Sequence, residues 1–214
     1  MTSQSQPTYY SQFEQDKFVE AIFFPHKRQG IFVDIGAYDG VYLSNSLYFE
    51  KHKEWKGLCI EPIPYIFEQL VQNRNCTCVQ GCVSANPGRA KFLISQGVEV
   101  LSSLVDACQP KHLQRIDSEV EKNGGAKQII EVDCFTFNAL LDQHGLYHVD
   151  YCSIDTEGTE LEILQSIDFN RFDIDVFTVE VNSPALELQK FMLSKGYRYV
   201  ETLGCDHVYK KFSH

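Results

Sequence analysis

Long apolar runs are absent from the sequence, and basic residues are few. No segment approaches the roughly 20 apolar residues that a membrane-spanning helix needs, and residues 1–7 are polar, unlike a secretory signal. Lys and Arg number 19 against 29 Asp and Glu, so the net charge is −10. This charge repels phosphate backbones and anionic lipids. We therefore expect no nucleic-acid partner, no membrane insertion and a cytoplasmic location.

Several short motifs are also missing. The sequence has no G-x-G-x-x-G dinucleotide fingerprint and no Gly-Lys-Ser/Thr phosphate loop, which disfavours hydride and phosphoryl transfer. It has no C-x-x-C pair, so its eight cysteines are expected to be reduced, mostly buried thiols rather than zinc ligands or a disulfide framework.

The length and composition favour one domain. A chain of 214 residues with 43% hydrophobic residues can bury a substantial core of its own. We expect a single domain over residues 1–214, with an N-terminal helical segment at 1–27 and an inserted cap or hairpin at 87–127.

The most informative stretch follows the apolar run 31–33, which is typical of a buried strand. Asp34, Gly36, Asp39 and Gly40 come directly after this run. Glycine allows close backbone approach to a ligand, and carboxylates accept hydrogen bonds from amino and hydroxyl groups. A second apolar run, 57–60, ends in Glu61. An acid about 20 residues past such a loop commonly binds a ribose diol, so the pattern predicts a nucleotide-like ligand.

Apolar periodicity predicts alternating helices and strands. Helices are expected at 9–24, 43–53, 63–73, 110–123, 135–144, 161–167 and 184–195, and strands at 31–33, 57–60, 76–83, 90–94, 98–104, 128–132, 149–154, 175–181, 197–202 and 207–212. The last two strands have no helix between them. They predict a closing antiparallel strand on an otherwise parallel sheet.

The motifs resemble those of the FkbM-type family of class I S-adenosylmethionine-dependent methyltransferases. The resemblance covers nearly the whole chain and is carried by Ser11-Gln12 with Gln15-Asp16, the segment DIGAYDG at 34–40, Ile60-Glu61-Pro62, Ser153-Ile154-Asp155 with Glu157-Gly158 and Glu160, Val179-Glu180-Val181-Asn182, and Gly196-Tyr197. It implies an α/β fold with a doubly wound, seven-stranded, mostly parallel sheet of the Rossmann-like methyltransferase type. Family members methylate hydroxyl groups of sugars and secondary metabolites.

The resemblance implies a set of residues that bind S-adenosylmethionine. Asp34, Gly36, Ala37 and Gly40 are expected at the methionine end, Asp39 at the methionine or ribose part, Glu61 with Pro62 at the ribose, Cys82, Val83 and Ser84 at the adenine, and Asp155 beside them. Many methyltransferases hold the adenine amino group with an acid after the third strand. This chain has Gly81-Cys82-Val83-Ser84 there instead.

A hydroxyl acceptor needs a base or a metal to remove or acidify its proton. We expect Asp155, Glu157 and Glu180 to be catalytic, because acids at the carboxyl ends of strands face the ligand crevice. Asp155, Glu180 and Asn182 also form a candidate site for Mg²⁺ or another hard divalent cation.

Other side chains remain open as parts of the site. His112 and His207 are rival bases. The aromatic residues Tyr9, Tyr10, Phe13 and Tyr38 are candidate walls for the acceptor, although such residues are more often core. Glu157 or Glu160 can instead interact with the N-terminus of the following helix.

The sequence therefore predicts O-methylation of a saccharide or another small hydroxylated metabolite. One alternative is a non-catalytic binding module that keeps the cofactor fold. The other is N-methylation of a different acceptor, disfavoured because no Asn/Asp-Pro-Pro-Tyr loop follows Asp155.

Overall fold

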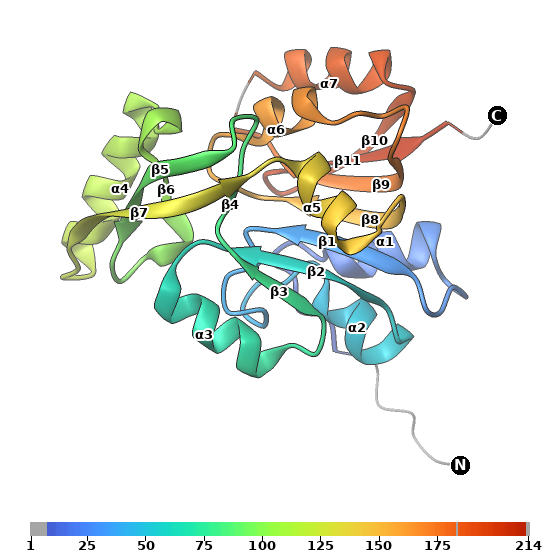
Figure 1. Cartoon of the computed structure of the whole chain (residues 1–214), viewed down its shortest axis with the longest axis horizontal. Coiled ribbons are helices and arrows are strands. Elements are labelled where there is room, and N and C mark those ends of the chain that lie inside the picture. The colour runs from blue at the N-terminus through green and yellow to red at the C-terminus, as the bar shows by residue number, and fades with distance from the viewer. Residues whose placement is uncertain (1–7, 183, 213–214) are drawn as a thin grey trace.

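The computed structural model describes residues 8–182 and 184–212, so the polar segment 1–7 lies outside the described residues. Its main feature is a sheet with helices on both faces (Figure 1). The sheet has seven strands in the order β10-β11-β9-β8-β1-β2-β3. Their bounds are β1 (Ile31–Ile35), β2 (Lys56–Glu61), β3 (Thr77–Gln80), β8 (His148–Ile154), β9 (Asp173–Glu180), β10 (Tyr197–Leu203) and β11 (Asp206–Lys211).

β11 runs antiparallel to both of its neighbours, β9 and β10, and the other neighbouring strands described in this sheet pair in parallel. The predicted fold class is confirmed, with one refinement. The closing antiparallel strand is not at the sheet edge, because β11 lies between β9 and β10.

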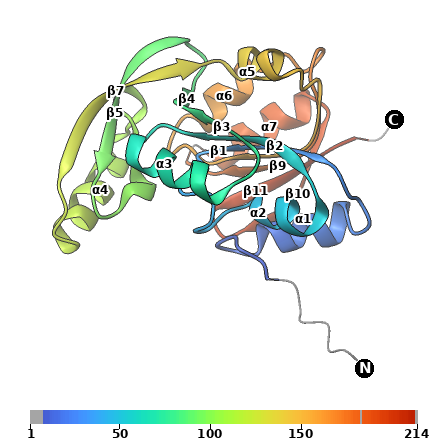
Figure 2. The same ribbon diagram turned by 60° about the horizontal axis from the view of Figure 1, so that its bottom comes forward.

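Two groups of helices sandwich the sheet (Figure 2). One face packs on α5 (Phe137–His144), α6 (Glu160–Ser166) and α7 (Ala185–Ser194), and the other on α1 (Gln15–Phe23), α2 (Leu47–Lys53) and α3 (Pro64–Asn73). Side chains alternate along a strand, so Val33 and Ile35 enter the first core and Phe32 the second. The described residues contain no helix that is both long and apolar enough to traverse a bilayer.

A second sheet projects from the first between β3 and α5 (Figure 1). Its four strands have the order β4-β7-β5-β6, with bounds β4 (Cys82–Val83), β5 (Gly88–Ser95), β6 (Ser103–Leu104) and β7 (Lys127–Phe135). The long helix α4 (Pro110–Lys122) packs Ile116 and Val120 against Leu93 and Leu101. The predicted insertion at 87–127 contains β5, β6 and α4, whereas β4 and nearly all of β7 lie outside its bounds.

Several predicted elements differ from the structure, among them the helix expected at 43–53, which begins at Leu47. The strand expected at 76–83 is divided at Gly81, where φ is 147° and an added Cβ would lie 2.7 Å from the Asp133 carbonyl oxygen. The segment 98–104 forms a 3-10 turn, Glu99–Leu101, and the two-residue β6. The strand at 128–132 belongs to the second sheet rather than the main one. The helix expected at 9–24 begins at Gln15, because the Asp16 carboxylate holds a turn through the Tyr10 and Ser11 backbone N–H groups.

Candidate active site

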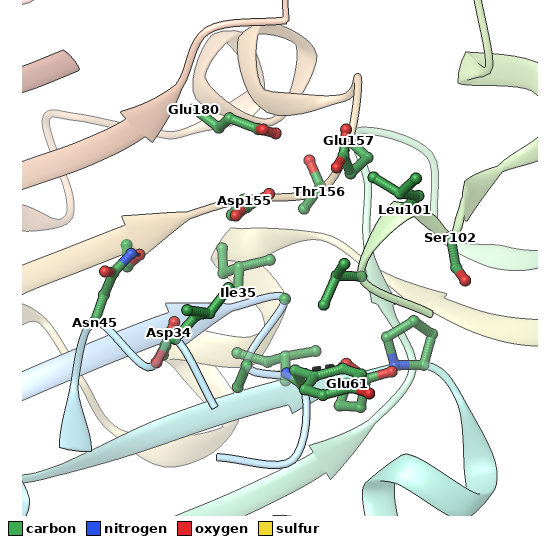
Figure 3. Close-up of a pocket in the computed structure, with 18 of the residues that line it drawn as sticks. Asp34, Ile35, Asn45, Glu61, Leu101, Ser102, Asp155, Thr156, Glu157 and Glu180 are labelled. Carbon is green, nitrogen blue, oxygen red and sulfur yellow. Dashed lines mark hydrogen bonds between the residues drawn. The ribbon is translucent and has the colours of Figure 1, made fainter. Parts of the chain in front are cut away.

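A cavity of about 440 Å³ lies where β1 and β8 end side by side. At this point the chain order of the strands reverses, the usual ligand position in open α/β sheets. Of the predicted residues, those that line the cavity are Asp34, Gly36, Ala37, Glu61, Pro62, Cys82, Val83, Asp155, Glu157, Glu180 and Asn182. The side chains reach it from several strand ends (Figure 3).

The glycine loop is held tightly against the end of β8. The backbone N–H groups of Gly36 and Ala37 both donate to the Ile60 carbonyl oxygen. At Gly36, φ is 84° and an added Cβ would lie 1.8 Å from the Asp155 carbonyl oxygen. Only glycine fits there, so the loop backbone itself forms part of the cavity wall.

Glu61 lies at the end of β2 and is almost completely buried. One of its carboxylate oxygens accepts from the Tyr38 backbone N–H at 3.1 Å and the other from the Ile63 N–H at 2.7 Å. Burial raises the pKa of Glu61 to about 7, although both hydrogen bonds oppose the shift. Each oxygen keeps a further lone pair, so the carboxylate can also accept from two hydroxyl groups of a ligand.

Asp34 accepts a hydrogen bond of 2.5 Å from the Ser46 hydroxyl. Burial raises its pKa, and the Ser46 hydroxyl and the nearby Arg74 guanidinium oppose that shift. Arg74 is itself buried, with Nε 2.8 Å from a Glu50 carboxylate oxygen. This network fixes the segment that follows the glycine loop.

Three predicted cofactor residues, Asp39, Gly40 and Ser84, do not line the cavity. The Asp39 carboxylate accepts from the backbone N–H groups of Val41 and Tyr42 and closes the loop. Gly40 packs against Arg74, and the Ser84 hydroxyl accepts from the Asn86 N–H. The structure gives these residues local roles, and their contact with the cofactor stays a prediction.

Asp155, Glu157 and Glu180 form a compact cluster on one wall (Figure 3), with one oxygen of each within 4.8 Å of the others. Burial and the Glu180 carboxylate raise the pKa of Asp155 well above its usual range. Burial also raises the pKa of Glu180. Two carboxylates this close share one proton and one negative charge over a wide pH range. The pair can therefore accept a proton at neutral pH.

The loop after β8 is organised by Glu160, which does not line the cavity. Its Oε1 accepts from the Thr156 backbone N–H at 3.0 Å and from the Gly158 N–H at 2.9 Å. The Asn182 amide nitrogen donates to Glu180 and lies 3.4 Å from the same Glu160 oxygen. Glu160 thus connects the ends of β8 and β9.

Glu157 connects this loop to α4 of the second sheet. It is held at a φ of 55° and is 6% exposed. Its Oε2 lies 3.4 Å from His112 Nδ1 and 3.5 Å from an Arg115 nitrogen, but forms no hydrogen bond. Burial and then the Glu180 carboxylate raise its pKa to about 8, while Arg115 lowers it. Arg115 was not predicted as a site residue, because periodicity does not show which helix returns to the cavity.

Asn45 and the pair Gln15 and Asp206 also line the cavity without having been predicted as ligand residues. The Asn45 amide nitrogen donates to the Ser153 hydroxyl at 2.9 Å, while its buried oxygen has no partner. Gln15 donates to Asp206 at 2.8 Å. Asp206 stands opposite Glu180 in the β9–β11 register. The polar run Ser44-Asn45-Ser46 after the loop was the available signal for Asn45.

The remaining candidates divide between the cavity and the core. Phe13 and Tyr38 line the cavity, whereas Tyr9 stacks on Tyr48 at 4.5 Å between ring centroids. Tyr10 packs against the core of α1 and α2. His207 is buried against the Tyr209 hydroxyl, and burial lowers its pKa.

The lining residues suit a cofactor that has an ammonium group and a ribose. The unpartnered Asn45 oxygen can accept from an ammonium group, and Glu61 keeps lone pairs for a diol. The Gly36 backbone leaves room for close approach. Acids outnumber Arg115 among the charged lining residues, so the cavity as a whole would repel a phosphate group.

Comparisons with known proteins agree with this geometry. The model of the methyltransferase FkbM domain matches residues 34–199. A methyltransferase FkbM from Methylobacillus flagellatus is 14% identical with a TM-score of 0.51, over 94% of this chain and 48% of that one. A precorrin-6y C5,15-methyltransferase from Geobacter metallireducens is 11% identical with a TM-score of 0.51, over 98% and 93%.

This chain thus spans about half the length of the Methylobacillus protein. Curated protein sequences gave no match. The two solved structures support the fold, and the domain match covers more than half of the chain. The chain belongs to the FkbM family of S-adenosylmethionine-dependent methyltransferases.

Proposed function

We propose that this protein transfers the methyl group of S-adenosylmethionine to a hydroxyl oxygen of a saccharide or another small metabolite. The observation that carries the proposal is the cluster of Asp155, Glu157 and Glu180 in the same cavity as the glycine loop and Glu61. A hydroxyl needs a proton acceptor, and a carboxylate pair with raised pKa values suits that task at neutral pH.

In this proposal the chain mainly positions the reactants. S-adenosylmethionine supplies an electrophilic methyl group on a sulfonium. Gly36 and Ala37 hold its methionine part, Asn45 accepts from its ammonium group, and Glu61 accepts from its ribose. The acceptor hydroxyl faces Asp155 and Glu180, which take its proton as the oxygen gains the methyl group. Alignment of this kind supplies much of the rate enhancement in a displacement reaction.

A hard divalent cation is a second route to the same activation. Carboxylate oxygens are the ligands that Mg²⁺ prefers. Asp155 and Glu180, with Asn182 beside them, would hold the ion. The Asn182 amide nitrogen donates to Glu180, and Glu157 offers a further oxygen within 4.8 Å of one oxygen of Asp155 and of Glu180. Activity measured with and without a chelator separates the cation route from the metal-free route.

The decisive experiment combines calorimetry with a methyl-transfer screen. We expect S-adenosylmethionine to bind the parent protein, and labelled methyl to appear on at least one hydroxylated acceptor. Glu180→Gln should lower that transfer about 100-fold or more, since a positioned base contributes 10²–10⁴-fold, while cofactor affinity changes less than threefold. Glu131→Gln, exposed on β7, is the matched control and should change neither.

The alternatives predict other outcomes. A non-catalytic binding module would bind the cofactor and transfer label to none of the acceptors. An N-methyltransferase would label amines in the same screen and leave hydroxyl compounds unlabelled. Full transfer by both Glu180→Gln and Asp155→Asn would contradict the assigned role of the carboxylate pair.

A further inference from the structure

The mouth of the cavity has an apolar rim, which we define as Phe13, Tyr38, Tyr42 and Val100. All four residues line the cavity. Phe13 is 39% exposed, Tyr42 57% and Val100 43%, although side chains of this kind are usually buried. An exposed apolar group beside a ligand cavity is a common mark of a binding surface.

The rim is assembled from three separate segments. A parallel bridge between Ser11 and Leu43 brings the residues around Phe13 and Tyr42 together. The rings of Tyr38 and Tyr42 meet edge to face, with centroids 6.1 Å apart. Val100 comes from the second sheet, in the 3-10 turn Glu99–Leu101.

The rim is held in place rather than loosely exposed. At Gly204, between β10 and β11, an added Cβ would lie 2.2 Å from the Phe13 ring, so the ring rests directly on that turn. The turn that carries Val100 is anchored by Glu99, which accepts from the Tyr65 hydroxyl at 3.1 Å. Pre-positioned aromatic and aliphatic side chains bind an apolar group at a low entropic cost.

The cavity has the volume of a single ligand pocket. A volume of about 440 Å³ lies in the lower part of the range for a single ligand pocket. With the cofactor on the Gly36 and Glu61 side, the reacting hydroxyl of the acceptor would face the carboxylates. The rest of the acceptor would then extend toward the rim, whose four side chains are aromatic or aliphatic.

We propose that the acceptor carries an alkyl or aryl group next to its reactive hydroxyl, and that the apolar rim binds this group. The inference rests on the proposed function and narrows its substrate class. A free, fully polar sugar would leave the rim exposed and gain nothing from it. The apolar group of an alkyl or aryl derivative of the same sugar would pack on the rim and remove it from water.

The test compares two probes that differ only in their apolar part, methyl β-D-glucoside and n-octyl β-D-glucoside below its micelle concentration. Binding to the protein saturated with S-adenosylhomocysteine is measured by saturation-transfer NMR. We expect the octyl compound to bind at least tenfold more tightly. Tyr42→Ser combined with Val100→Ser should reduce this preference to less than threefold. The control Ile22→Ser removes an equally exposed residue, 56% on α1, and should keep the preference.

Binding of S-adenosylhomocysteine distinguishes a failure of the proposed function from a failure of the rim inference. If S-adenosylhomocysteine does not bind, the proposed function fails. If it binds, but the glucosides bind equally or not at all, only the rim inference is overturned. A preference that survives in the double variant also overturns it. So does a concentration-dependent dimer that the double variant abolishes, because the rim would then contact a second copy of the chain.

Discussion

Cofactor binding should strengthen as the pH rises through neutrality, because of Glu61. Burial raises the pKa of Glu61 to about 7. In the folded protein Glu61 therefore keeps a proton between its unfolded pKa near 4.5 and about 7, and its contribution to stability falls as the pH rises through that window. Ribose hydroxyls donate best to the ionised carboxylate. If binding requires that form, the dissociation constant for S-adenosylmethionine should be about tenfold higher at pH 6 than at pH 8.

Glu61→Gln should remove this pH dependence and weaken binding at pH 8, where the parent carboxylate is mostly ionised. The amide oxygen can still accept from one of the two backbone N–H groups, but the amide nitrogen cannot accept from the other. The unpaired buried donor should lower the free energy of unfolding by about 1–3 kcal/mol, whereas the lost charge-assisted bonds to the ribose should weaken binding by a similar amount. The expected loss of affinity at pH 8 is therefore at least tenfold.

Calorimetry at pH 6, 7 and 8 on the parent protein, Glu61→Gln and the exposed control Glu131→Gln measures both effects. The control should follow the parent. An unchanged pH slope in Glu61→Gln, or a flat profile in the parent, would refute the assignment of Glu61 to the ribose.

Three further substitutions test the framework of the site. Gly36→Ala should abolish cofactor binding and lower the melting temperature, because the new Cβ would lie 1.8 Å from the Asp155 carbonyl oxygen. The control is Gly145→Ala, whose new Cβ would meet nothing within 4 Å, and it should lower the free energy of unfolding by only about 1 kcal/mol. Arg74→Met should lower the free energy of unfolding by about 3–5 kcal/mol in denaturant titrations, because it leaves the Glu50 carboxylate buried without its ion-pair partner. A loss below about 1 kcal/mol would argue against a stabilising role for this network. Partial burial lowers the pKa of His148, but the hydrogen bonds of its ring to two carboxylates outweigh this effect, so the pKa is raised. The stabilising effect of the protonated ring is therefore present at pH 5 and is lost as the pH rises past the raised pKa. His148→Gln should remove this pH dependence from the melting temperature.

The sequence was sufficient to predict the main sheet and the wall made by its strand ends. Asp34, Glu61, Asp155 and Glu180 each follow an apolar run, and parallel strands bring their carboxyl ends to one edge. The prediction worked because each residue is placed by its own strand. The DIGAYDG segment added specificity, since the Gly36 conformation leaves no room for a side chain.

Residues placed by contacts between distant segments could not be predicted. Arg115 reaches the cavity only because α4 packs on the second sheet, and Asp206 because β11 lies next to β9. Apolar periodicity describes one element at a time and does not show where that element docks. For the same reason periodicity predicted the strand at 128–132 correctly but did not show that it belongs to the second sheet.

The internal position of β11 constrains the order in which the domain can assemble during synthesis. The ribosome makes β10 first, yet β10 has no backbone partner in the main sheet until β11 has inserted beside β9. A nascent chain that still lacks β11 therefore exposes an unpaired strand, which is prone to aggregation. It also lacks Asp206, so the wall of the cavity is completed only in the last stage of folding.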